Sequence, residues 1–174
     1  MRKKMIVTPK KYFYFLILTL FLPLSLILPQ RHTIKTYTIE DGLPTNVVND
    51  VVQDNSGKMW FATEIGITSY DATSWQNYRE EEGLASANYL RIKKDTQGTL
   101  WTISHFAASP ILFLHDNEWR PIKQINYTYG ERTYTAFDVK IVNGKPVLIV
   151  GTENSLYMFK NDKWLDLGKV YKQL

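Results

Sequence analysis

The chain has 174 residues, of which 44% are hydrophobic and 14% aromatic, and it has no cysteine. This composition can supply one hydrophobic core, whereas a disulfide framework and a thiolate metal site are excluded. The formal net charge is +4, but the first eleven residues alone supply five positive charges, and the remainder carries 16 basic and 17 acidic residues. Because no basic surface remains outside that terminus, we expect no nucleic-acid partner.

Residues 12–29 (YFYFLILTLFLPLSLILP) contain no charged side chain and follow a basic start. This order is typical of a signal peptide, and the length is also close to that of a short membrane span. For residues 1–30 two interpretations stay open: a cleaved signal peptide, or an uncleaved signal anchor held in the inner membrane by residues 12–29. In both, the basic end stays in the cytoplasm, so we expect residues 31–174 to be exported to the periplasm or another extracytoplasmic location.

An internal repeat with a period of 41 residues begins after residue 37. Its members in the first copy are Gly42, Leu43, Asp54, Gly57 and Trp60, and in the second copy Gly83, Leu84, Asp95, Gly98 and Trp101. A period near 40 residues is typical of a solenoid, a propeller or an array. A weaker third copy follows at an offset of 89 residues, where Thr152-Glu153 matches Thr63-Glu64 and Ile149 stands in place of Trp60.

Each copy shows four short β-type segments separated by turns rich in Gly, Asn, Asp and Ser. The segments predict strands at 47–53, 58–63, 67–70 and 75–79; at 88–94, 99–104, 110–115 and 118–122; and at 134–142, 146–152, 155–160 and 163–167. The predicted fold class is therefore all-β, a partial β-propeller after an N-terminal hydrophobic helix. Its approximate blades are 46–79, 88–122 and 134–167, and a spare leading strand at 33–39 aligns with the fourth strand of the first blade.

The tryptophans could form a binding platform or pack between blades. We interpret them as packing residues, because a large ring at the same place in each repeat buries much apolar surface. These residues are Trp60, Trp101, Trp75, Trp119 and Trp164.

The first copy resembles the two-component regulator propeller repeat. That repeat runs D-G-L-P-x-N-x-V, Q-D-x-x-G-x-x-W, A/G-T, G-[LI] and Y-D, and here these stand at 41–48, 53–60, 62–63, 66–67 and 70–71. The resemblance implies the N-terminal part of the periplasmic sensor region of a hybrid two-component system or sensor histidine kinase, a family in which many members sense carbohydrates. The chain contains no phosphoacceptor His motif and no nucleotide-binding box, so no kinase activity is assigned to it.

Length sets a further constraint, because propellers need about 4–8 blades. Residues 31–174 supply three, which predicts a fragment of a longer sensor or a truncated one. The expected partners are therefore the missing blades or, as an alternative, further copies of this chain in self-association.

In a blade, the loops before the first strand and after the second lie on one face. We expect a ligand, an oligosaccharide or another small molecule, on that face, with the enlarged loop at His105 as its most distinctive part. The candidate residues are Thr45, Asn46, Glu64, Ser86, Asn88, His105, Glu153 and Asn154. The alternative is that these are solvated loop residues. No metal and no cofactor are expected.

Two other functions are open. Lyases and glycan-cleaving enzymes of propeller fold carry similar repeats, but acid–base chemistry needs a correctly held His or carboxylate pair. The histidines are His32, His105 and His115, and nothing around them forms a recognisable catalytic set, so we predict that the chain is not an enzyme. The other alternative is a structural protein-interaction module.

Overall fold

The computed structural model describes residues 34–82, 84–105, 110–122, 134–153 and 155–168. Residues 34–36 belong to a separate unit, and the fold is that of the chain from Tyr37 on. The predicted signal segment, residues 1–30, lies outside the described residues. Among the described residues, no helix is long and apolar enough to cross a membrane.

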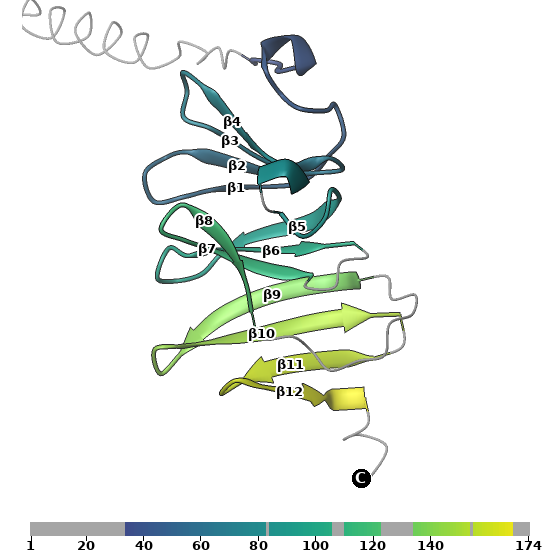
Figure 1. The fold of residues 1–174 in the computed structure, drawn as a ribbon. Coiled ribbons are helices and arrows are strands. Elements are labelled where there is room, and N and C mark those ends of the chain that lie inside the picture. Colours follow the sequence, from purple (N-terminus) through teal and green to yellow (C-terminus); the bar gives the residue numbers. More distant parts are fainter. Residues whose placement is uncertain (1–33, 83, 106–109, 123–133, 154, 169–174) are drawn as a thin grey trace, which may run out of the picture. The chain divides into compact units, whose positions relative to one another are not determined.

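Three four-stranded sheets form the described fold, and in each one the strands pair antiparallel in sequence order (Figure 1). The prediction of three such sheets is confirmed, and every strand begins and ends within one residue of its predicted range. The first sheet holds β1 (Val48–Gln53), β2 (Met59–Thr63), β3 (Gly66–Tyr70) and β4 (Trp75–Tyr78). The second holds β5 (Tyr89–Lys94), β6 (Leu100–Ser104), β7 (Ile111–His115) and β8 (Glu118–Pro121). The third holds β9 (Tyr134–Val142), β10 (Lys145–Thr152), β11 (Leu156–Lys160) and β12 (Lys163–Asp166).

The predicted leading strand at 33–39 is wrong for the part that the structure describes. Residues 34–38 are not a strand, and Ile39–Asp41 is a short 3₁₀ helix. Thr38 caps this helix: its hydroxyl accepts from the Glu40 amide, while its own amide donates to the Asp41 carboxylate at 2.8 Å. Gly42 ends the turn at φ 108°. The local cap satisfies backbone groups that a strand would have to pair with a neighbouring sheet edge.

A repeated aspartate–tryptophan clamp explains the 41-residue motif. Asp95 accepts from the amides of Gln97 and Thr99 at 2.8 and 3.0 Å, and its second oxygen accepts from the Trp101 indole at 2.8 Å. Asp54 repeats this arrangement, with the Trp60 indole again at 2.8 Å. One carboxylate thus closes the turn between the first two strands of a sheet and fixes the direction of the ring. We refer to this arrangement as the Asp–Trp clamp.

The motif glycine serves the same turn. Gly57 and Gly98 have φ of 91° and 92°, a backbone conformation that residues with a Cβ rarely adopt. The third sheet lacks the clamp and instead joins β9 to β10 through Asn143-Gly144, both at positive φ. A two-residue Asn-Gly turn is the preferred connection for a tight hairpin, so this sheet needs no carboxylate at that place.

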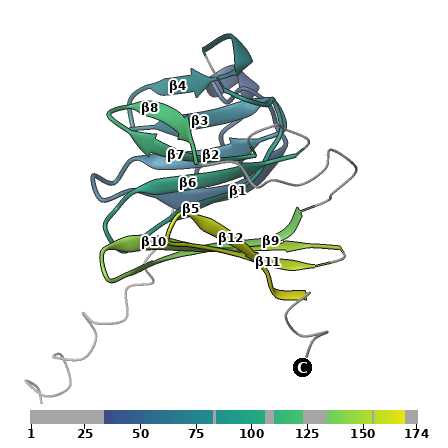
Figure 2. The same cartoon turned by 60° about the horizontal axis from the view of Figure 1, so that its bottom comes forward.

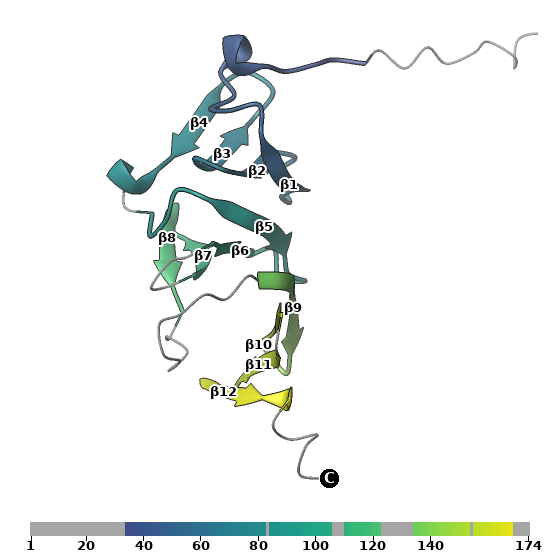
Figure 3. The same ribbon diagram turned by 90° about the vertical axis from the view of Figure 1, so that its right-hand side faces the viewer.

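The sheets pack face to face in chain order, β1 and β2 against β5 and β5 against β9 (Figure 2, Figure 3). Two buried clusters lie between them. The first cluster contains Trp60, Ala62, Ile67, Leu84, Tyr89, Ile92, Leu100 and Leu112. The second contains Trp101, Ile103, Ile111, Phe137, Val139, Leu148, Val150, Tyr157 and Phe159. Trp60 and Trp101 are 3% and 5% exposed, so the clamped rings form part of the inter-sheet core.

The outer-strand tryptophans meet these rings. The rings of Trp60 and Trp119 pack edge to face with centroids 5.9 Å apart. Trp164 contacts Phe159 and packs on the second cluster. Trp75 stacks on Tyr70 at 4.5 Å, and Tyr37 packs edge to face on Trp75 at 5.6 Å. Tyr37 therefore gives Trp75 the kind of contact that Trp60 gives Trp119.

The buried clamp predicts a large loss of stability on substitution. Replacing Asp95 by Ala leaves the Trp101 indole and two amides without their acceptor, which should lower the free energy of unfolding by about 3 kcal/mol. The matched control is Glu118→Ala, which removes only an exposed pair with Arg120 and should change stability by less than about 0.5 kcal/mol. Urea denaturation of both variants measures the difference; equal effects would contradict the role of the clamp.

The turn after β3 predicts acid sensitivity. Hydrogen bonds from Thr73 and Ser74 hold the pKa of Asp71 well below its usual range. A carboxyl whose folded-state pKa is lowered stabilises the fold above its unfolded value, about 3.9, and this contribution disappears as the pH falls further. Asp71→Asn keeps an acceptor oxygen but does not titrate. The urea midpoint of the wild type should exceed that of the variant most at neutral pH, and the difference should shrink below about pH 4. A difference independent of pH would contradict this assignment.

Candidate functional site

The turn after the second strand of each sheet is held by a hydroxyl group. Thr63 donates to the Gly66 carbonyl at 2.8 Å, Ser104 to that of Pro110 at 3.3 Å, and Thr152 to that of Ser155 at 3.1 Å. Thr63 and Ser104 are fully buried. These hydroxyls anchor the turns, and the residue that follows each of them stands at the same end of its sheet.

In the first sheet that following residue is Glu64, which is exposed. The Thr45 hydroxyl donates to the Glu64 carboxylate at 2.8 Å and accepts from the Val47 amide at 3.1 Å. Thr45 itself is only 9% exposed. Since both bonds fix the hydroxyl, the carboxylate is held in place by a residue that belongs to the scaffold.

In the second sheet the equivalent residue is His105, and Ser86 stands 41 residues after Thr45. The Ser86 hydroxyl donates to the His105 carbonyl at 3.1 Å, and the His105 amide donates to the Asn88 carbonyl at 2.8 Å. All three residues are half-buried. Burial raises the pKa of the neighbouring Tyr89, so the phenol stays neutral next to this loop.

Asn49 joins the two sheets at this end and is a residue that sequence reasoning missed. Its side-chain amide donates to Asn88 Oδ1 at 3.2 Å and to the Tyr89 carbonyl at 2.8 Å. The neighbouring Asp50 accepts from the Ile92 amide at 3.1 Å. A β-bulge between Val48 and Asp50 directs these side chains to the second sheet. No sequence signal marks the bulge, because its residues resemble the rest of the strand.

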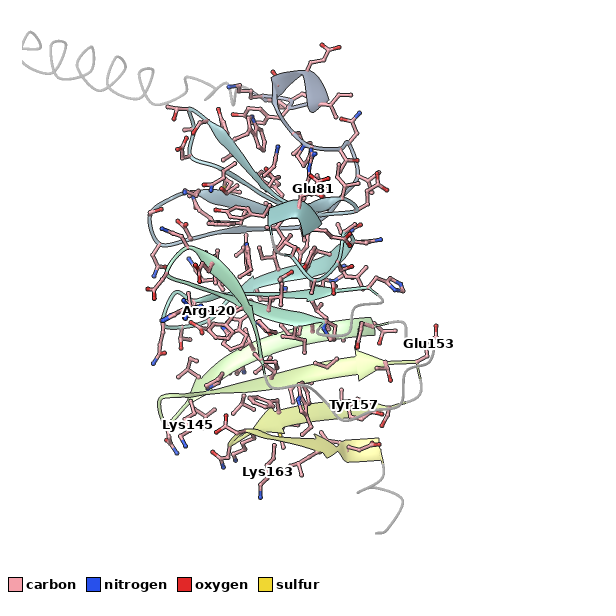
Figure 4. All side chains as sticks on the ribbon, viewed as in Figure 1. Glu81, Arg120, Lys145, Glu153, Tyr157 and Lys163 are labelled. Carbon is pink, nitrogen blue, oxygen red and sulfur yellow. The ribbon has the colours of Figure 1, made fainter. Side chains whose placement is uncertain are left out.

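The predicted ligand face is thus brought together in part. The structure joins Thr45 with Glu64, and Ser86 and Asn88 with His105, and Asn49 links the two groups. Asn46 and Glu153 are exposed and do not join them, and Asn154 lies outside the described residues. Figure 4 places Glu153 and Lys145 at opposite ends of the third sheet. Within the described ranges, no three His, Asp or Glu side chains are grouped so that they could hold a metal ion.

Comparison with protein families identifies the first repeat. Residues 42–64 match the family model described as two component regulator propeller. The resemblance stated from the sequence is therefore confirmed, and the chain carries a repeat of this family. No curated protein matches the chain in sequence.

Solved structures show the same fold. The chain is similar to the extracellular domain of the one-component system BT4673 of B. thetaiotaomicron, with 17% identity and a TM-score of 0.61 over 76% of this chain and 18% of that chain. The extracellular domain of the hybrid two-component system BT3049 from the same organism gives 15% identity and a TM-score of 0.61 over 80% of this chain and 19% of that one. Virginiamycin B lyase from Staphylococcus aureus gives 13% identity and a TM-score of 0.50 over 69% and 40%.

These identities show the fold alone, a propeller-like series of antiparallel four-stranded sheets. The chain spans less than a fifth of the length of the two extracellular domains. Both of these domains come from signalling systems and lie outside the cytoplasm by their description.

The link between the first two sheets is testable. Asn49→Ala removes both inter-sheet hydrogen bonds and leaves the Tyr89 carbonyl without this donor, so the free energy of unfolding should fall by about 1–2 kcal/mol. The matched control is Asn46→Ala, an exposed asparagine on the same loop, which should change stability by less than about 0.5 kcal/mol. Urea denaturation of both variants tests this, and an Asn49 variant as stable as the control would refute the link.

Proposed function

We propose that the described sheets are part of the ligand-sensing propeller of an extracytoplasmic sensor in two-component signalling. The observation that carries the proposal is the regulator propeller repeat at residues 42–64 within a fold shared with extracellular sensor domains. An apolar segment after a basic start, at residues 1–30, supports export and contact with the inner membrane. Signalling output belongs to the whole sensor and is not assigned to these residues.

The ligand site is proposed at the sheet end that carries Glu64 and His105. A carboxylate, an imidazole and the amide of Asn88 offer both acceptors and donors, which suits the hydroxyl groups of a small oligosaccharide. The scaffold fixes this set, because Thr45 and Ser86 hold the residues on either side of it. A preorganised polar rim of this kind loses little side-chain entropy when a ligand binds.

The same place offers a route to signalling. Asn49 joins the first sheet to the second between Glu64 and His105, so a ligand that touches both sheets would favour one packing of the pair over another. A ligand shifts such an equilibrium only by its differential affinity for the two states. In this proposal the sensed quantity is therefore the fit of the first sheet against the second.

An enzyme remains the second candidate, because a lyase shares the fold. The described histidines do not favour it: His105 is spaced along the rim from Glu64, and His115 is exposed and pairs with Asp116 at 3.2 Å. Turnover of a glycan or a macrocyclic peptide would support the enzyme, saturable binding without turnover the sensor, and binding of proteins alone the interaction module.

Calorimetric titration of the full chain with maltohexaose and xylohexaose tests the site. For whichever sugar binds, Glu64→Gln and His105→Ala should each weaken the affinity roughly tenfold, the value of one well-made hydrogen bond to a charged or buried group. Asp116→Asn is the control, since it alters an exposed turn at the other end of the second sheet. Unchanged affinity in both site variants would remove the ligand from this face.

A further inference from the structure

Exposed apolar side chains gather on the two end sheets of the described fold. On the first sheet Val48 and Val51 are 40% and 48% exposed, and on the third sheet Leu156 and Leu165 are 39% and 45% exposed. Among the described residues, the middle sheet exposes no large apolar side chain to this degree. The exposure therefore follows the lack of a neighbouring sheet.

The register shows on which faces these side chains lie. Val51 pairs with Phe61 on β2, next to the pair of Val52 with the buried Trp60, so Val51 points away from the second sheet. On the third sheet Ile149 pairs with Met158, and Met158 pairs with Leu165, all opposite in direction to the buried Leu148 and Val150. We call the outer surface of the first sheet the leading face and that of the third sheet the trailing face.

Both faces repeat surfaces that the chain buries elsewhere. Val48 and Val51 stand 41 residues before Tyr89 and Ile92, which are 0% and 1% exposed against the first sheet. Leu156 stands 89 residues after Ile67, which is fully buried against the second sheet. The leading face is thus built to receive a trailing face, and the reverse, in the same polarity as the internal interfaces.

The two faces also complement each other in volume. At the internal interface the Trp60 ring of one sheet packs on Trp119 of the next. The trailing face has only Ile149 at the Trp60 position, whereas the leading face already carries an additional ring, Tyr37, on Trp75. The aromatic group that the trailing face lacks is the one that the leading face brings.

Charge supports the same pairing. Lys140, Lys160 and Lys163 share the trailing face near the β9–β10 and β11–β12 turns, where Val147 pairs with Lys140 and Lys160 with Lys163. Lys145 lies at the same end, as Figure 4 shows for Lys145 and Lys163. The corresponding turns of the first sheet carry Asp54 and Asp71. Between residues 37 and 79 there are six carboxylates and two cationic side chains, so a lysine row on one face meets an acidic edge on the other.

We propose that the trailing face of one chain docks on the leading face of a second copy. Two copies supply six four-stranded sheets, within the 4–8 blades with which propellers close. The dimer then contains two identical contacts related by a two-fold axis and leaves no sheet face open. This interaction is independent of the ligand proposed above.

The absence of cysteine allows a clean test by cross-linking. Full-length Val51→Cys and Leu165→Cys chains, mixed in a mild detergent and treated with a short bismaleimide, should give a cross-linked dimer. Each variant alone should give little, because the contact joins unlike faces. The control mixture is Asp116→Cys with Leu165→Cys, which pairs an exposed turn of the middle sheet with the trailing face. Cross-linking no greater than in this control would overturn the proposal.

Sedimentation equilibrium gives an independent measurement with other variants. The full chain should show a dimer, and Lys160→Glu with Lys163→Glu should weaken it roughly tenfold or more because like charges then face each other. Both lysines are exposed, so the fold should persist, as circular dichroism can verify. A wild-type chain that remains monomeric, or a charge-reversed chain that dimerises equally well, would overturn the proposal.

Discussion

The hydrogen bond from a tryptophan indole to an aspartate six residues earlier organises the first two sheets. Because the same carboxylate closes the turn before the second strand, turn geometry and ring direction are set together. The ring that it directs then forms the wall of the inter-sheet core. The third sheet shows what replaces this bond: an Asn143-Gly144 hairpin closes the turn, and the smaller Ile149 stands where the ring would be.

Local chemistry explains why the sheets could be predicted from the sequence and the start of the fold could not. Turn residues such as Asp54 and Gly57 and the short β-type runs between them determine where strands begin, whatever packs around them. The segment before Gly42 has the same strand-like composition, but Thr38 and Asp41 form a capping pair that satisfies its backbone locally. Strand pairing depends on a neighbour, and composition alone does not show whether a neighbour is present.

The candidate site shows the same division between the scaffold and its variable positions. Thr63, Ser104 and Thr152 do the same work in three sheets, while the residue after each is Glu, His and Glu. The repeat offset was therefore sufficient to find Glu64 and His105. Asn49 was out of reach because its role comes from a bulge, which shifts the side chains by one place without a change in residue type. Its partners lie 39 and 40 residues away, a distance over which a pattern of single residues carries no information.

A series of sheets that contact only their neighbours has a particular weakness at its ends. Each internal face is stabilised by the next sheet, so an end face loses that whole contribution at once. Tyr37 replaces part of it over β3 and β4, through its contacts with Tyr70 and Trp75, and the remaining exposed valines lie on β1. On the third sheet, the leucines of β11 and β12 stay 39% and 45% exposed. The unequal cover of the two ends follows from the order of the chain: the residues that precede the first strand can fold back on the outer strands of the first sheet, and this is where Tyr37 lies.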